Sequence, residues 1–265
     1  RAFVSVREQL SDTADTSMDR PLSAFSGAYE YRSIVYDKSV ILFDRLHEVL
    51  GAKLLAGLRR CFAAAKGGVE IHSVHVLNTQ YEPQLYAEHP RVLEDAYGWL
   101  KEVLASANIL GAHNYTFHGI ARLKRTFREN WQRFSALTAQ IYETCRAAGV
   151  RLCYENVEWA LYNRPGLFAL LKKDCQGLGG VLDIKQARIT GYDWREYLAD
   201  MGSNLATVHV SDVTAEGKMC LPGQGVFDFA ELFARLRGIG FDGAVLIENY
   251  ARDYDEPEEL RRSFE

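Results

Sequence analysis

The sequence has no apolar run that approaches the roughly 18 residues needed to span a bilayer, and it does not open with the pattern of a signal peptide. We therefore expect a cytoplasmic protein that does not enter a membrane. Its five cysteines (Cys61, Cys145, Cys153, Cys175 and Cys220) are odd in number and scattered, with no Cys-x-x-Cys pair. This favours free thiols in a reducing compartment over a disulfide framework.

A dense run of basic residues is also missing. The 31 lysines and arginines are outnumbered by 35 aspartates and glutamates, which gives a formal net charge of −4. The nearest candidate for a basic patch, residues 122–125, is short and is better explained as the solvated start of a helix. A nucleic-acid binder is therefore disfavoured, and a small-molecule ligand is expected.

No glycine-rich phosphate loop follows any expected strand, which argues against an open, doubly wound sheet. Apolar stretches typical of strands instead alternate with helical patterns along the chain. We expect strands at residues 2–6, 28–36, 69–77, 112–119, 149–158, 179–183, 205–210 and 243–248. Helices are expected at residues 40–66, 90–107, 125–148, 165–174, 192–201 and 227–237, and from 257 onward. This alternation predicts an α/β protein, with one (β/α)8 TIM barrel domain covering residues 1–265.

Four successive expected strands end on a residue that can bind a metal ion: Glu155, Asp183, His209 and Glu248. Neighbouring barrel strands end around one mouth, so these side chains should face one another. Taken singly, Asp183 is better explained as a helix cap and His209 as a hydrogen-bonded histidine. Together, three carboxylates would repel unless protons or a cation neutralise them. Their convergence predicts one divalent ion, with Mn²⁺ favoured and Mg²⁺, Co²⁺ or Zn²⁺ as alternatives.

Short motifs also occur in a fixed order from about residue 69 to the C-terminus. They are residues 71–75 (IHSVH), 117–119 (FHG), 155–156 (EN), 181–187 (VLDIKQA), 208–212 (VHVSD), 221–225 (LPGQG) and 247–249 (IEN). As an ordered set they resemble the xylose-isomerase-like barrels. That family contains sugar isomerases and epimerases and, more distantly, DNA-repair enzymes of the endonuclease IV type. The resemblance implies an enzyme of the isomerase class that acts in carbohydrate metabolism.

In the epimerase branch, the positions that match Glu155, Asp183, His209 and Glu248 hold one divalent metal ion. The resemblance also implies that Glu155 and Glu248 exchange protons with the substrate carbon. This is chemically coherent, because a Lewis acid on a carbonyl stabilises an enediolate and a carboxylate on each face can remove and return the proton. The chain departs from many relatives at Gln186, where they have histidine. It also lacks the Asp-x-His motif that completes the three-zinc site of the endonucleases.

Further side chains are candidate sugar ligands at the same mouth: His75, His118, Asn156, Lys185, Gln186 and Asp212. His75 and His118 could instead join Glu155 around a second ion, as in the endonuclease pattern, but pocket-lining imidazoles are favoured. Lys185 could bind a substrate phosphate or carboxylate, or pair with a neighbouring aspartate. Asp212 could equally cap the loop that follows it.

The function expected from these residues is that of a metal-dependent sugar or keto-sugar isomerase or epimerase. Dehydration of a keto-polyol or cleavage of a C-glycoside at the same site is the nearest alternative, because it shares the enolate step. A two-metal phosphodiesterase of the endonuclease IV type and a non-catalytic binding subunit are further alternatives, and a homo-oligomer stays open. Since the chain begins within an expected strand and ends within an expected helix, we also expect residues beyond both ends.

Overall fold

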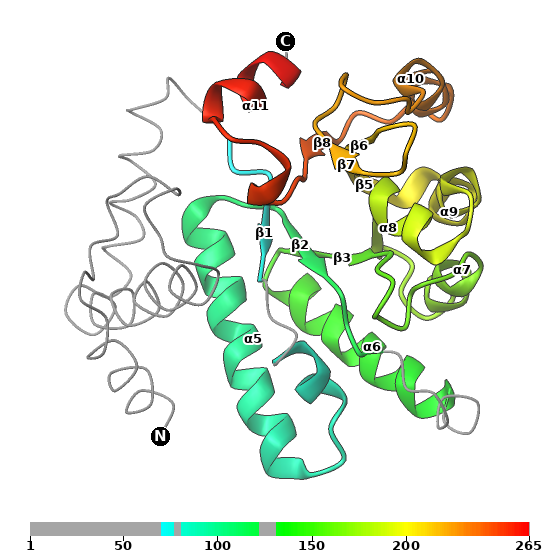
Figure 1. The fold of residues 1–265 in the computed structure, drawn as a ribbon. Coiled ribbons are helices and arrows are strands. Elements are labelled where there is room, and N and C mark those ends of the chain that lie inside the picture. The colour runs from blue at the N-terminus through cyan, green and yellow to red at the C-terminus, as the bar shows by residue number, and fades with distance from the viewer. Residues whose placement is uncertain (1–69, 77–80, 122–130, 265) are drawn as a thin grey trace, which may run out of the picture. The chain divides into compact units, whose positions relative to one another are not determined.

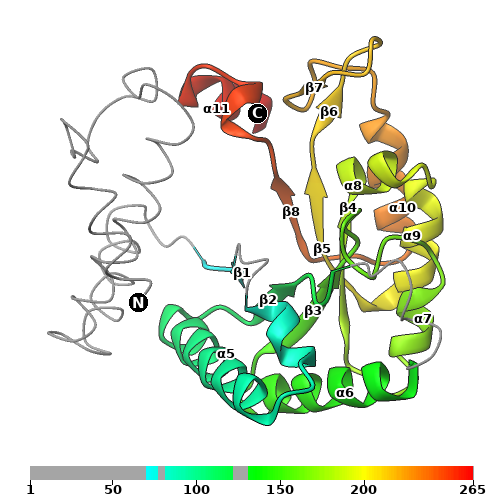
Figure 2. The same ribbon diagram turned by 60° about the horizontal axis from the view of Figure 1, so that its bottom comes forward.

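The structure is a computed structural model that describes residues 70–76, 81–121 and 131–264. Its central feature is a sheet of six parallel strands in the order β1-β2-β3-β4-β5-β8. The strands are β1 (Ser73–His75), β2 (Asn114–Phe117), β3 (Arg151–Glu155), β4 (Gly179–Asp183), β5 (Leu205–Val210) and β8 (Ala244–Ile247). Figures 1 and 2 show these strands curling into a half barrel with helices along its outer side.

Helices connect the strands and cover the convex side of the sheet. The α-helices are α5 (Pro90–Leu110), α6 (Trp131–Ala147), α7 (Leu167–Leu171), α8 (Ile184–Thr190), α9 (Trp194–Met201), α10 (Phe229–Gly238) and α11 (Pro257–Phe264). Short 3-10 helices are η3 (Glu82–Tyr86), η5 (Gly202–Asn204) and η6 (Ala251–Asp253). The longest of these helices, α5, begins at a proline, whose missing N–H costs nothing in a first turn. It is capped at its C-terminal end by Gly111, which has φ 78°.

The apolar core lies between the sheet and the helices. Tyr115 and Leu152 are fully buried and belong to this core. Because side chains alternate along a strand, Cys153 and Val181 point to the opposite, inner side, where they form a small second cluster with Ala206. The inward residues at the carboxyl ends of the strands therefore reach a common mouth.

Most predicted elements between residue 70 and the C-terminus have their counterpart in the structure. Strands 179–183 and 205–210 match β4 and β5 residue for residue. The prediction missed α8, because this helix begins directly at the end of β4 with no intervening break. It also missed the antiparallel pair β6 (Asp212–Val213) and β7 (Met219–Cys220). The strands predicted at 2–6 and 28–36 and the helix at 40–66 lie outside the described residues, so the single-domain assignment over 1–265 stays a prediction.

The described cysteines, Cys145, Cys153, Cys175 and Cys220, are buried free thiols, as expected from their spacing. Burial raises the pKa of the Cys153 thiol to about 12, so this side chain is protonated and unreactive at neutral pH. Within the part of the chain that the structure describes, no helix has the length and apolar character needed to cross a membrane.

Candidate metal centre

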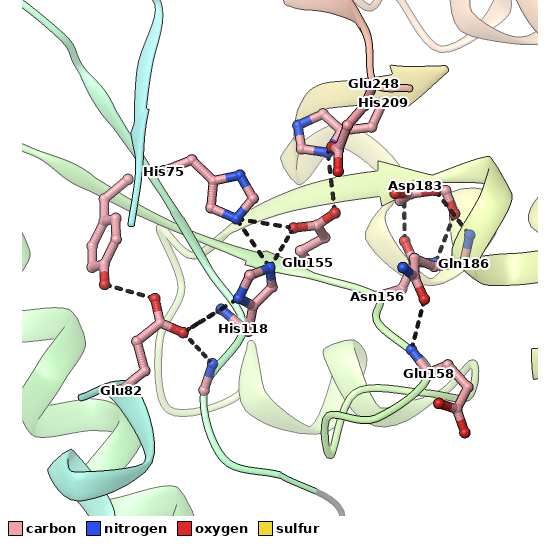
Figure 3. Close-up of polar contacts among 12 residues, drawn as sticks. His75, Glu82, His118, Glu155, Asn156, Glu158, Asp183, Gln186, His209 and Glu248 are labelled. Atoms are coloured by element: carbon pink, nitrogen blue, oxygen red, sulfur yellow. Dashed lines mark hydrogen bonds and ion pairs between the residues drawn. The ribbon is translucent and has the colours of Figure 1, made fainter. Parts of the chain in front are cut away.

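Four side chains that can bind a metal ion lie together at the carboxyl ends of adjacent strands. Glu155 and Asp183 are the last residues of β3 and β4, His209 lies on β5, and Glu248 directly follows β8. The parallel register places Asp183 opposite His209. One ligand atom from each of the four residues lies within 4.8 Å of the others, and Figure 3 shows Glu155, His209 and Glu248 in contact.

The donors of this cluster fit a cation. Glu155, Asp183 and His209 are at most 3% exposed, and Nδ1 of His209 lies 3.0 Å from Oε1 of Glu155 and also contacts Oε2 of Glu248. Oε2 of Glu155 and Oδ2 of Asp183 are buried and make no well-aligned hydrogen bond with the described residues; their charged neighbours include Nε2 of His118 at 3.1 Å and Nζ of Lys185 at 3.8 Å. Buried carboxylate oxygens without a full set of donors are costly, so this donor set suits a divalent ion.

The pKa values in the cluster show the same need for positive charge. Burial raises the pKa of Asp183 to about 7, and the nearby Glu155 carboxylate acts in the same direction. Burial alone would also raise the pKa of Glu155, but His209 and His118 hold it well below its usual range. Burial alone would lower the pKa of His209, yet the carboxylates of Glu155 and Glu248 raise it to about 10. The His209 imidazolium thus supplies positive charge that a bound divalent ion would otherwise provide.

Asp183 uses its two oxygens for different tasks. Its Oδ1 accepts a hydrogen bond from the N–H of Gln186 at 2.8 Å and so caps α8, while its Oδ2 has no such bond. Asn156 fixes the backbone of Asp183, since its Nδ2 donates to the carbonyl at 2.9 Å and its Oδ1 accepts from the N–H at 2.8 Å. Asp183 can therefore cap the helix and bind an ion together, and Asn156 bridges β3 and β4.

A second group of candidate ligands shares Glu155. Nε2 of His75 and Nε2 of His118 lie 3.0 Å apart, at 3.7 Å and 3.1 Å from Oε2 of Glu155. Burial lowers the pKa of His75. Burial opposes the charged form of His118 as well, but the carboxylate of Glu155 outweighs it and raises the pKa. Nitrogens that converge in this way suit a sugar hydroxyl or a second ion, which are the two interpretations that the sequence left open.

Lys185 lies beside the cluster as a buried cation. Its Nζ is 3.8 Å from Oδ2 of Asp183 and 3.6 Å from Oε1 of Glu248. Burial would lower its pKa, but these two carboxylates raise it, so the side chain is charged at neutral pH. Gln186 has a different contact, because its Oε1 accepts from the N–H of Glu158 at 3.1 Å. This bond ties the loop after β3 to α8.

Asp212 organises the loop that leads into α10. Its carboxylate is buried, and Oδ1 accepts from the N–H groups of Val213 and Phe227 at 2.7 and 3.0 Å. Oδ2 accepts from the N–H groups of Gly223 and Gly225 at 3.0 and 2.9 Å. A Cβ at Gly225 would lie 2.4 Å from Oδ1 of Asp212, so glycine is needed for this close approach. The geometry supports the loop cap that the sequence offered as the alternative to sugar binding.

A residue that the sequence analysis did not identify lies behind His118. Glu82 is the first residue of η3 and is 0% exposed. Its Oε2 accepts from the N–H groups of His118 and Gly119 at 2.9 and 3.0 Å, and its Oε1 accepts from the Tyr115 hydroxyl at 2.7 Å. Burial raises the pKa of Glu82 to about 7. In the sequence, its surroundings (Tyr81-Glu82-Pro83) carry no periodicity that would have placed it.

A family model described as xylose isomerase-like TIM barrel matches residues 43–265 of the chain. No curated protein sequence matches it. Three similar solved structures share the fold at low sequence identity. D-psicose 3-epimerase from Clostridium cellulolyticum H10, determined with D-tagatose, has a TM-score of 0.67 and 17% identity, over 83% of this chain and 82% of that one.

The second solved structure is a D-tagatose 3-epimerase-like protein, with a TM-score of 0.64 and 21% identity over 81% of this chain and 79% of that one. The third is the IolI protein with a bound zinc atom, with a TM-score of 0.60 and 16% identity over 83% of this chain and 79% of that one. At such identities these neighbours establish the fold alone, because one fold hosts many chemistries.

Proposed function

The chain belongs to the xylose isomerase-like TIM barrel family, and we propose that it is a metal-dependent sugar or keto-sugar isomerase or epimerase. The observation that carries the proposal is the convergence of Glu155, Asp183, His209 and Glu248 at one mouth of the half barrel. Two structural neighbours are named as sugar 3-epimerases or epimerase-like, and a third was determined with zinc. These names support a sugar substrate and a divalent ion.

The four residues of the cluster would hold one divalent ion. Three oxygen donors and one imidazole favour Mn²⁺, with Mg²⁺, Co²⁺ and Zn²⁺ as alternatives. When bound, the ion would polarise a substrate carbonyl and make the neighbouring C–H more acidic. Lys185 keeps a further positive charge 3.6 Å from Glu248 and 3.8 Å from Asp183, which lowers the repulsion among the carboxylates.

Glu155 and Glu248 carry the proposed proton transfer. They come from β3 and from the residue after β8, and both contact Nδ1 of His209. The pKa of Glu155 is held low by His209 and His118 against the effect of burial. The pKa of Glu248 is lowered by His209, also against burial. Both side chains are thus ionised and can act as a base.

One carboxylate removes the proton from the carbon beside the carbonyl, which leaves an enediolate of the sugar. For isomerisation, the same carboxylate returns this proton to the neighbouring carbon. For epimerisation, the second carboxylate takes up a proton from water and delivers it to the opposite face of the same carbon, and the first carboxylate then releases its proton to water. His75 and His118 line the mouth and can donate to or accept from sugar hydroxyls.

The experiment that tests the proposal incubates the protein with a panel of ketopentoses and ketohexoses in D₂O and follows products by NMR and mass spectrometry. We expect deuterium at the carbon next to the carbonyl, retention of all other atoms, and loss of activity with a chelator. Glu155→Gln and Glu248→Gln should each lower kcat by about a hundredfold or more. The exposed Glu216→Gln serves as the matched control and should leave kcat unchanged.

The metal-dependent mechanism would be refuted if the purified protein contained no divalent ion and a chelator did not affect turnover. Loss of water from the substrate would instead identify a dehydratase, and release of an aglycone from a keto-C-glycoside added to the panel would identify a C-glycoside lyase. Both outcomes would keep the proton-abstraction step and change the reaction class.

The group formed by His75, His118 and Glu155 favours one second candidate. With one ligand atom from each residue within 4.8 Å of the others, it would complete a two-metal phosphodiesterase together with the first cluster. Two ions per chain and nicking of abasic DNA would support this candidate. One ion per chain, with no cleavage of such DNA, would leave the isomerase proposal in place.

A further inference from the structure

Lys185 is a buried cation beside two of the four candidate metal ligands. We propose that it is a positioning residue which completes the charge balance of the metal centre and does not bind substrate. The inference deepens the proposed function and rests on the cluster of Glu155, Asp183, His209 and Glu248 holding one divalent ion. It decides between the two roles that the sequence left open for Lys185, which are ligand of a substrate anion and partner of a neighbouring aspartate.

The ammonium group of Lys185 lies among groups that favour a positive charge. The residue is 3% exposed, and its Nζ lies 3.8 Å from Oδ2 of Asp183 and 3.6 Å from Oε1 of Glu248. Nζ also donates to the carbonyl oxygen of Glu248 at 3.4 Å and lies 4.6 Å from the centre of the Tyr250 ring. A substrate anion would have to displace one of these groups to reach the ammonium group.

The place of Lys185 in the chain does not favour a cation by itself. It is the second residue of α8, two positions after the N-cap Asp183. The N–H groups in the first turn of a helix disfavour a positive charge, and burial disfavours it further. The two carboxylates therefore account for the lysine, whereas the helix does not. Since Asp183 ends β4 and Glu248 follows β8, Lys185 links the ends of two strands that β5 separates.

The charges of the metal centre balance when Lys185 is included. The cluster contains three carboxylates and one imidazole, and an imidazole binds a metal ion in its neutral form. A divalent ion would therefore leave one negative charge, which Lys185 neutralises beside Asp183 and Glu248. The same positive charge repels a bound cation, because charges a few ångströms apart interact strongly in a buried place. Lys185 thus holds the carboxylates together before an ion binds and lowers their affinity for it.

Calorimetry of Mn²⁺ binding to the whole chain, at one pH and without substrate, tests the proposal. Lys185→Met keeps the length of the side chain and removes its charge, so Mn²⁺ should bind about tenfold or more tightly than to the wild type. Lys185→Arg keeps the charge and should keep the wild-type affinity. Loss of a purely structural contact would weaken Mn²⁺ binding in Lys185→Met, so the sign of the change separates the effect of charge from that of shape.

Lys173→Met is the matched control, because Lys173 is exposed and its loss changes the net charge of the chain equally. It should keep the wild-type affinity for Mn²⁺. Where Lys185→Met gives too little folded apo-protein for calorimetry, thermal denaturation replaces it. At the same Mn²⁺ concentration, the melting temperature of Lys185→Met should then rise by more than that of the wild type. Unchanged or weaker binding, or in its place an equal or smaller rise, would overturn the proposal.

Where sugar turnover is found, Lys185→Met should leave the ratio of KM for a phosphorylated sugar to KM for its unphosphorylated form unchanged. A rise in KM confined to the phosphorylated sugar would overturn the proposal, because Lys185 would then be a substrate ligand. Tighter Mn²⁺ binding without turnover of any sugar would support the role of Lys185 and remove only the isomerase assignment. Turnover by the wild type, with Mn²⁺ affinity unchanged in Lys185→Met, would keep the isomerase and reject the role of Lys185.

Discussion

Replacing Asp212 with asparagine separates its two proposed roles, loop cap and sugar ligand. The carboxylate accepts from four backbone N–H groups, two on each oxygen, at 2.7 to 3.0 Å. An asparagine side chain has the same shape but only one acceptor oxygen. Whichever way the amide turns, its NH₂ group faces two N–H donors that the second oxygen had satisfied.

The cost follows from those two lost bonds. Hydrogen bonds to a charged acceptor contribute about 1.5 kcal/mol or more each, and a donor left unpaired in a buried place costs a similar amount. Asp212 is only 2% exposed, so water cannot easily replace the missing acceptor. We therefore expect Asp212→Asn to lower the free energy of unfolding by about 3 kcal/mol.

Chemical denaturation followed by fluorescence measures this loss. Asp228→Asn is the matched control, since the Asp228 side chain is exposed and caps α10 through one N–H, that of Glu231, at 2.8 Å. Asparagine caps a helix as well as aspartate does, so this control should change stability by less than about 0.5 kcal/mol. If Asp212→Asn costs less than about 1 kcal/mol while sugar turnover is lost, the carboxylate binds substrate and the loop-cap argument is wrong.

Three further predictions concern Gly119 and the Asp183 carboxylate. Gly119→Ala adds a Cβ 1.9 Å from the Tyr154 hydroxyl oxygen at φ 77° and should cost more than about 2 kcal/mol in thermal denaturation, partly recovered when Tyr154→Phe is added. Asp183 has its pKa raised to about 7 by burial and by Glu155, and it must lose its proton to bind an ion. His209, whose pKa is raised to about 10, must lose its proton as well. Calorimetry should therefore show Mn²⁺ affinity falling by up to about tenfold per unit between pH 10 and 7, and by up to about a hundredfold per unit below pH 7. Mn²⁺ at a hundred times its Kd should raise the free energy of unfolding by about 2.7 kcal/mol, a gain that Asp183→Asn should largely remove.

The elements that sequence predicted best are the ones buried on both faces. Every residue of β4 and β5 is buried, so each strand is a continuous apolar run that stands out from its surroundings. β1 has only three residues, all partly buried. The strand predicted at 69–77 was therefore longer than the strand in the structure. The sequence did not predict α8, because Asp183 is both the last residue of β4 and the N-cap of the helix. No turn residue therefore separates the two elements.

Site residues at strand ends can be assigned from sequence more readily than those in loops. The hydrogen bonds between parallel strands fix their register. A polar residue at one strand end therefore lies beside the end of the next strand, as Asp183 lies opposite His209. Contacts made by loops depend on chain paths that no local pattern encodes. Glu82 meets the backbone of a residue 36 positions later, and Asp212 meets that of Gly225.

We therefore expect a polar residue near the mouth to bind sugar only if its polar atoms do not already hydrogen-bond to the backbone. Asn156 uses its amide on the backbone of Asp183, and Asp212 uses both oxygens on its loop. His75 and His118 instead direct Nε2 atoms toward Glu155, where a substrate held over the cluster would lie. Among the predicted sugar ligands, these two imidazoles are the ones whose replacement should change substrate preference, whereas changes at Asn156 and Asp212 should act first on stability.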